Sequence, residues 1–196
     1  MISLLDLSVC PWYHDDIIAF GNQIKHKGEG YDARKQIRYV YYSYCHLTTA
    51  IDRIMAMGGS YVLNVGPDGK GEITEEYASR IRRIGDWYRR TESCLQCAEG
   101  DDFNYKIQAN EYIATKKNGK TYLHFYNGIR SSSVALRYFP SFPKQVRLLN
   151  TGKELSYAID PLPEYSSNGQ AVPYLHVTGI PIDDLSAEPI ILEIEW

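Results

Sequence analysis

The sequence predicts two unlike parts: a piece of a parallel α/β sheet or barrel, followed by an antiparallel β-sandwich. Apolar residues recur with a helical period before about residue 96 and with a period of two after about residue 99. The chain has 196 residues, enough to bury a core. A complete (β/α)₈ barrel needs at least about 200 residues. We therefore expect one domain over 1–98 and a second over 99–196.

The first part has the order helix, buried strand, helix. Apolar residues spaced three and four apart predict a helix over 47–57, which Gly58-Gly59 ends. The run 61–65 is almost continuously apolar, as a strand buried on both faces should be. Thr74 can cap a second helix, whose first turn carries acidic residues that the helix dipole favours. This order is typical of parallel α/β folds.

The second part consists of short alternating runs separated by turn residues. Asn118-Gly119 is a signal for a type I′ turn, so 111–127 is expected to form a hairpin. Short strands with Gly and Pro turns are typical of an antiparallel β-sandwich. Further alternating runs lie at 132–139, 144–150, 155–159, 174–178 and 189–196.

The second strand of the hairpin presents two different rows of side chains. Alternation places Tyr122, His124 and Tyr126 on one face, and Leu123 and Phe125 on the other. We expect the tyrosine row to be core, with His124 satisfied by a neighbour. The Leu123 and Phe125 row is expected to pack against the first part of the chain. A tyrosine row that faced outward would instead be a candidate sugar-binding patch.

Charge and cysteine content exclude several classes of partner. The 21 basic and 24 acidic residues give a net charge of −3, without the basic excess that nucleic acid or an anionic membrane surface requires. The sequence has no run of about 18 apolar residues, so we expect no membrane-spanning helix. The first residues lack the basic region of a signal peptide. Cys94 and Cys97 form a single Cys-x-x-Cys pair at a helix end, so we expect no metal site.

Two motifs carry a family resemblance. The run MGGSYVLNVGPDGKGEI at 57–73 resembles the last barrel strand of the α-L-fucosidases of glycoside hydrolase family 29. The segment 83–87 resembles a motif in the helix that follows that strand in the family. The resemblance implies that 1–98 is an incomplete (β/α) barrel remnant, the C-terminal part of a (β/α)₈-type catalytic barrel. It also implies that 99–196 is the C-terminal β-sandwich of such an enzyme.

The same resemblance implies a parent reaction, the retaining hydrolysis of terminal α-L-fucose from glycans without a metal or organic cofactor. A retaining glycosidase needs a nucleophilic and an acid/base carboxylate about 5 to 5.5 Å apart. In the family the nucleophile is an aspartate on a mid-barrel strand, and only about 60 residues precede Tyr61 here. We expect this chain to lack the nucleophile and to be inactive alone, with a fucosylated glycan and the missing barrel half as partners. Enzymes of the family are often secreted, periplasmic or lysosomal.

The first candidate site is a loop near the start of the chain. Residues 4–9 predict a strand, and Trp12, His14 and Asp15 follow in the loop at its C-terminal end. In barrel enzymes that end of the strands carries the active site, and these residue types suit sugar recognition. The alternative is a surface loop that opens a helix, with Asp15 or Asp16 as its N-cap.

The second group of candidates lies around the predicted helix–strand–helix unit. Tyr42, Tyr44 and His46 stand roughly where the family places aromatic residues that pack on fucose. Asn64 lies near the end of the predicted last strand, where its side chain can orient neighbouring loops or bind sugar. The alternative for the tyrosines is ordinary half-buried packing. The alternative for Asn64 is a structural role in which its side chain makes hydrogen bonds within the protein.

Two other functions remain open at this point. One is a non-catalytic carbohydrate-binding or scaffolding module. The other is a self-standing α+β domain whose partner chain supplies the rest of a site. An upstream segment that encodes the missing barrel strands would favour the glycosidase over both.

Overall fold

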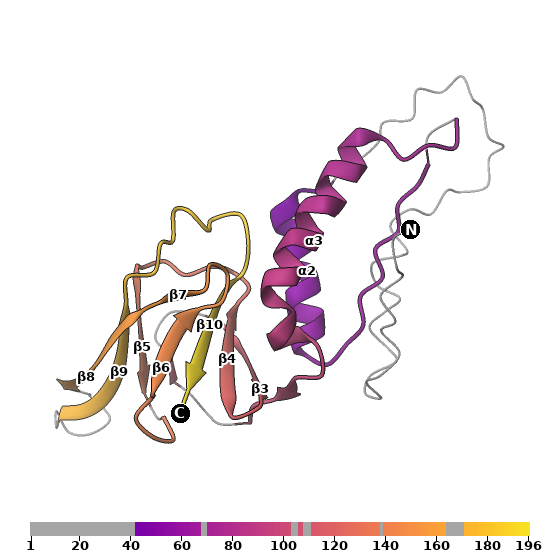
Figure 1. The fold of residues 1–196 in the computed structure, drawn as a ribbon. Helices are drawn as coiled ribbons and strands as arrows, with labels where there is room; N and C mark the ends of the chain where they lie inside the picture. Colours follow the sequence, from indigo (N-terminus) through magenta and orange to yellow (C-terminus); the bar gives the residue numbers. More distant parts are fainter. Residues whose placement is uncertain (1–41, 68–69, 103–105, 108–110, 138, 164–170) are drawn as a thin grey trace.

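In the computed structural model, residues 42–67, 70–102, 106–107, 111–137, 139–163 and 171–196 are described, and they form a mostly antiparallel sheet domain with two helices (Figure 1). Within those residues, neither helix is long and apolar enough to cross a membrane. The helices are α2 (Tyr44–Ala56) and α3 (Glu75–Leu95). The strands are β1 (Glu99–Gly100), β2 (Lys106–Ile107), β3 (Ile113–Lys117), β4 (Lys120–Phe125), β5 (Ser133–Arg137), β6 (Gln145–Leu148), β7 (Lys153–Glu154), β8 (Ser156–Pro163), β9 (Ala171–Thr178) and β10 (Ile190–Glu195).

Both predicted helices are confirmed, and local interactions explain where each of them begins. Helix α2 begins three residues earlier than its apolar spacing indicates, because Ser43 caps it and accepts a hydrogen bond from the His46 N–H. Helix α3 begins after Thr74, with Glu75 and Glu76 in its first turn. The Thr74 side chain makes no capping hydrogen bond, so the acidic first turn and the apolar face stabilise the start of this helix.

The predicted buried strand at 61–65 is wrong for this chain. The segment is not part of a sheet, and Val62 is 70% exposed. A parallel strand becomes buried only when strands pair with it and helices cover it. Among the described residues no strand pairs with 61–65, so its apolar side chains have no partners. Figure 1 shows α2 and α3 running in broadly the same direction, while the chain between them runs back the opposite way.

The strands form two antiparallel sheets. The larger has the order β1-β3-β4-β10-β6-β7 and the smaller the order β2-β5-β9-β8. The predicted hairpin is confirmed as β3 and β4, in which Lys117 pairs with Lys120. Asn118 and Gly119 between them have φ values of 52° and 76°, the left-handed values that a type I′ turn requires. The other predicted alternating runs correspond to β5, β6, β8, β9 and β10.

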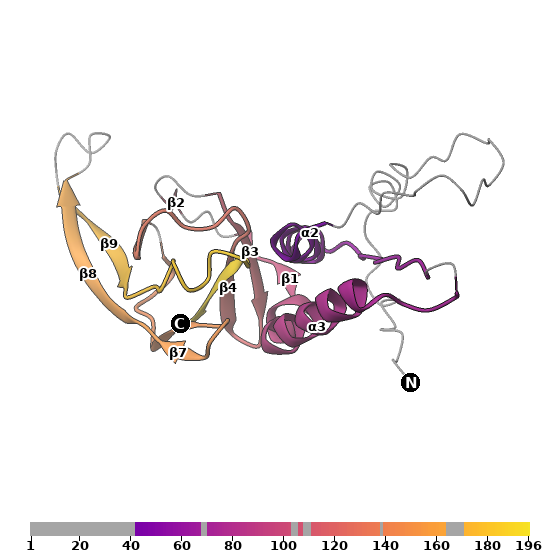
Figure 2. The same ribbon diagram turned by 90° about the horizontal axis from the view of Figure 1, so that it is seen from above.

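One hydrophobic core lies between the two sheets. Leu123 and Phe125 of β4 and Leu192 of β10 are completely buried there against Leu136 of β5 and Leu175 of β9. Inward and outward residues alternate along β5 and β6, as a sheet with one apolar face requires. Figure 2 shows α2 and α3 on one side of β3 and β4, with β8 and β9 on the far side.

A second core joins the helices to the outer face of the larger sheet. Trp87 of α3 is fully buried and shares this core with Tyr122 of β4 and Ile191 of β10. The expected burial is confirmed for Tyr122 and His124, whereas Tyr126 is partly exposed. Which face meets the helices was predicted the wrong way round. Leu123 and Phe125 are wholly apolar and enter the core between the sheets, because the polar atoms of the His124 row need partners that the helices supply.

Candidate functional site

The structure describes four of the seven candidate residues. Trp12, His14 and Asp15 lie outside the described residues. Tyr42, Tyr44 and His46 lie at the start of α2, and Asn64 is exposed on the extended segment between the helices. The start of α2 is therefore the place where the structure brings predicted site residues together.

Tyr42 and His46 form an aromatic pair at the surface. Their rings stack with centroids 4.9 Å apart and an interplanar angle of 15°. Tyr42 is 43% exposed, and His46 is also exposed. The Ser43 cap fixes this arrangement, because it holds the backbone of His46 in the first turn of the helix.

Tyr44 points the other way, into the interface between the helices and the sheet. It is 7% exposed, and its hydroxyl donates to Glu188 Oε2 at 2.9 Å. The Arg83 guanidinium lies 3.8 Å from the centre of its ring. Burial, followed by the interaction with Glu188, raises the pKa of Tyr44 from 10.0 to about 12. Tyr44 is one of the predicted sugar-binding residues, but its ring packs in the core between the helices and the sheet.

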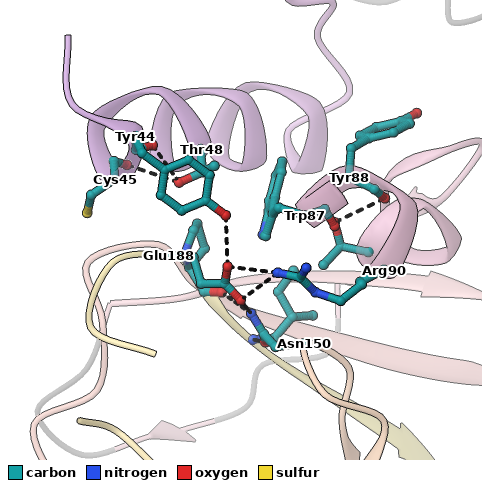
Figure 3. Close-up of polar contacts among 11 residues, drawn as sticks. Tyr44, Cys45, Thr48, Trp87, Tyr88, Arg90, Asn150 and Glu188 are labelled. Atoms are coloured by element: carbon teal, nitrogen blue, oxygen red, sulfur yellow. Dashed lines mark hydrogen bonds and ion pairs between the residues drawn. The ribbon is translucent and has the colours of Figure 1, made fainter. Parts of the chain in front are cut away.

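Glu188 collects hydrogen bonds from three separate segments (Figure 3). Besides Tyr44, Arg90 of α3 donates to it at 3.0 and 3.3 Å, and Asn150 Nδ2 donates at 2.9 Å. Asn150 also accepts from the Ile191 N–H at 2.9 Å, which ties the network to β10. Because Glu188 is held at once from α2, α3 and the turn after β6, the loop before β10 is fixed against the first turn of α2.

A groove of about 630 Å³ lies between that loop, the loop after β4 and the start of α2. Its floor is aliphatic, with Ile129, Leu185 and Ile190 buried. Its rim is polar, and none of the lining residues is a lysine or an arginine. The lining residues are Ser43, Cys45, His46, Thr49, Tyr126, Asn127, Gly128, Ile129, Ile182, Asp183, Leu185, Ser186, Glu188 and Ile190.

Three buried polar side chains form a hydrogen-bonded series beneath the helices. The sequence predicts that His124 is buried with a partner, but it does not identify Asp52 or Thr115 as that partner. His124 Nδ1 lies 2.9 Å from Asp52 Oδ1, and its Nε2 lies 2.9 Å from Thr115 Oγ1. Asp52 and His124 are fully buried and Thr115 is 1% exposed. The order carboxylate, imidazole, hydroxyl occurs in acyl-transfer enzymes, but a substrate cannot reach groups this deeply buried. These three side chains therefore join α2 to β3 and β4. The sequence signal for Asp52 is a carboxylate at a buried position of an amphipathic helix, and the signal for His124 is its place on the row expected to be core.

The described residues contain no group of three or more His, Cys, Asp or Glu side chains that could hold a metal ion. Cys94 is buried, and its thiol donates to the Thr91 carbonyl at 2.9 Å. Burial raises the pKa of that thiol well above its usual value. Cys97 is exposed at the helix end, so the two sulfurs lie in different surroundings.

Comparisons with known proteins agree on one family. The family model for alpha-L-fucosidase matches residues 24–93. An α-fucosidase from Thermotoga maritima, solved with a mechanism-based inhibitor, is 22% identical with a TM-score of 0.57, over 79% of this chain and 34% of that one. The enzyme from Vibrio sp. strain EJY3 is 21% identical with a TM-score of 0.58, over 79% of this chain and 26% of that one.

A third solved structure is a trapped covalent intermediate of a family 29 α-L-fucosidase from Bacteroides thetaiotaomicron. It is 20% identical with a TM-score of 0.57, over 80% of this chain and 33% of that one. No curated protein matches the chain. The chain thus spans about a third or less of the length of these enzymes. Its fold is similar to that of part of an α-L-fucosidase, its residues 24–93 match the family model, and the resemblance predicted from its motifs is confirmed.

Proposed function

We propose that the chain is the C-terminal segment of an α-L-fucosidase-like glycoside hydrolase, whose whole form removes terminal α-linked fucose from glycans with retention. The observation that carries the proposal is the family match over 24–93, which includes both sequence motifs and the whole of α2. Residues 1–98 would then complete a catalytic barrel, and 99–196 would be a β-sandwich packed on its helices.

The arrangement of the helical unit supports the barrel assignment. Consecutive helices of a (β/α)₈ barrel run parallel, and the strand between them runs back. Helix α2 has 13 residues and is about 20 Å long at about 1.5 Å per residue. A strand needs about six residues to return over that length. The apolar run 61–65 has nearly that length and lies on the returning segment, and no strand among the described residues pairs with it.

The chemistry of retention assigns different roles to this chain and to the rest of the enzyme. A retaining glycosidase forms a covalent glycosyl-enzyme on one carboxylate while a second acts as acid and then as base. A covalent intermediate was trapped in the Bacteroides enzyme, as this mechanism requires. The nucleophile would come from the upstream barrel half. In this chain Trp12, His14 and Asp15, with Tyr42, His46 and Asn64, would contact the substrate, and Tyr44 would position the start of α2.

The proposal is tested with a chromogenic α-L-fucoside. We expect no turnover by the 196-residue chain alone, and turnover when the upstream barrel half of an α-L-fucosidase is co-expressed with it. The control is the same upstream half with its nucleophilic aspartate replaced, which should give none. Turnover by the chain alone that disappears in Asp15→Ala would contradict the proposal, because it would place the chemistry in the first loop.

A further inference from the structure

We propose that the groove between the first turn of α2 and the loops of the sheet domain binds the neutral sugar residues of a glycan beyond the fucose that is cleaved. The choice of a glycan rests on the proposed function. The choice of this groove rests on its lining, its charge and its place in the fold.

The lining of the groove combines the two kinds of surface that a sugar ring presents. Ile129, Leu185 and Ile190 give an apolar floor for the C–H face of a pyranose. Asp183, Ser186 and other rim residues supply oxygen atoms for its hydroxyls. A mostly apolar concave surface with a few placed polar groups is the usual form of a small-ligand site.

The charges of the groove select neutral ligands. Its lining includes two carboxylates, Asp183 and Glu188, and no lysine or arginine. A phosphate or an anionic sugar would therefore be repelled by Asp183, whereas Glu188 is already paired with Arg90. A second groove of about 520 Å³ beside the β3–β4 turn differs in this respect, because Lys116, Lys117 and Lys120 line it.

The groove also lies at the appropriate end of the helical unit. In a (β/α)₈ barrel the N-termini of the helices and the C-terminal ends of the strands share the catalytic face. Ser43 and His46, at the start of α2, line the groove, so it opens towards that face. The nucleophile bonds to the fucose and would come from the upstream barrel half, so we assign the fucose to that half and the sugar attached to it to the groove.

A peptide fits the groove less well than a glycan. Extended peptides usually bind by adding a strand to an exposed sheet edge. The edge strands of the larger sheet are β1 and β7. The groove is instead formed by one helical turn and the loops that flank β4 and β10.

Two rim residues are available to a ligand. Asp183 is exposed, and no side chain among the described residues makes a hydrogen bond or ion pair with its carboxylate. Ser186 is also exposed. Glu188 in contrast is already engaged by Tyr44, Arg90 and Asn150. We therefore assign recognition to Asp183 and Ser186, and support of the loop to Glu188.

The test is a titration of the full chain by ¹H–¹⁵N NMR with three probes: lactose, 2′-fucosyllactose and methyl α-L-fucoside. We expect lactose and 2′-fucosyllactose to shift the amides of 43–49 and 182–188 with a Kd of about 1 mM. Methyl α-L-fucoside should not shift them. Selective shifts with methyl α-L-fucoside, or no shifts with lactose, would overturn the proposal.

Asp183→Ala should weaken lactose binding about tenfold or more, because it removes a charged acceptor. Asp184→Ala is the matched control: Asp184 is also exposed, is the next residue along the chain and does not line the groove. Unchanged lactose binding by Asp183→Ala, or the same loss of binding in Asp184→Ala, would also overturn the proposal. Binding of an unstructured peptide at the same residues, with no shifts caused by lactose, would overturn it as well. None of these outcomes decides the fucosidase proposal, which depends on turnover with the upstream barrel half.

Discussion

At the scale of single residues, the most consequential contact is the buried pair of Asp52 and His124. It joins α2 to β4 across 72 positions of sequence, with both side chains fully buried. Removing one member of a buried pair leaves the other without compensation, which typically costs about 3 to 5 kcal/mol. We expect Asp52→Ala to lower the free energy of unfolding by about 3 kcal/mol in urea denaturation.

The control for this prediction is Asp86→Ala. Asp86 forms an exposed ion pair with Arg89 on the same helix, and such pairs contribute about 1 kcal/mol or less. Equal losses in the two variants would show that the buried pair contributes no more to stability than a surface pair.

The second prediction at this scale concerns alkaline pH and Tyr44. Its pKa is raised from 10.0 to about 12, mainly by burial and then by Glu188. The unfolded chain therefore loses this proton near pH 10, and the folded chain only near pH 12. The stabilising contribution is complete below about pH 10 and is lost as the pH rises to about 12. In Tyr44→Phe, the decline in melting temperature between pH 10 and 12 should be shallower.

Two further tyrosines are needed to interpret that measurement. The pKa of Tyr122 is also raised to about 12, so part of the alkaline decline should remain in Tyr44→Phe. Tyr157→Phe is the control, because its exposed side chain donates to the backbone carbonyls of Pro143 and Lys144. The prediction fails if Tyr44→Phe and Tyr157→Phe change the decline equally.

At the scale of elements, local signals were sufficient wherever the cause of a structure is local. Asn118-Gly119 requires two left-handed residues, and the hairpin formed where this pair predicts it. The acidic turn after Thr74 likewise marked the start of α3. In contrast, the alternation of β4 separates Tyr122 from Leu123 without saying which row meets the helices. That choice depends on Asp52, which lies on a different element.

The segment 61–65 also shows that a local pattern does not predict structure that depends on distant elements. Its apolar run describes an environment that neighbouring strands would supply, so it predicts a barrel strand but not the exposed segment seen here. We therefore expect Val62→Lys to change the stability of this chain by less than about 0.5 kcal/mol, because Val62 is 70% exposed. In the reconstituted enzyme the same substitution should abolish turnover, because it would place a charge among barrel strands.

Ile73→Lys is the matched control for that experiment. Ile73 is 48% exposed and lies beyond the predicted strand, just before α3. It should leave both the stability of the chain and the turnover of the reconstituted enzyme nearly unchanged. Full activity of the reconstituted Val62→Lys enzyme would mean that 61–65 is not a barrel strand.

At the scale of the whole molecule, the helices and the larger sheet share one core. Trp87, Tyr122 and Ile191 are buried together, and the Glu188 network lies beside them. The two proposed domains therefore support each other physically, although their secondary structures differ. The start of α2 and the loop before β10, which line one groove, are joined by the hydrogen bond from Tyr44 to Glu188.

The shared core leads to the last prediction, on cooperativity. Residues 99–196 alone would expose the face of β4 and β10 that α2 and α3 cover, including Tyr122, His124 and Ile191. Exposed apolar faces of this kind promote association and dye binding. We expect the full chain to unfold in a single calorimetric transition, with equal calorimetric and van't Hoff enthalpies. We expect 99–196 to melt at a lower temperature and to bind a hydrophobic dye. Two separate transitions in the full chain, with the upper one matching isolated 99–196, would instead show that the sheet domain is stable without the helices.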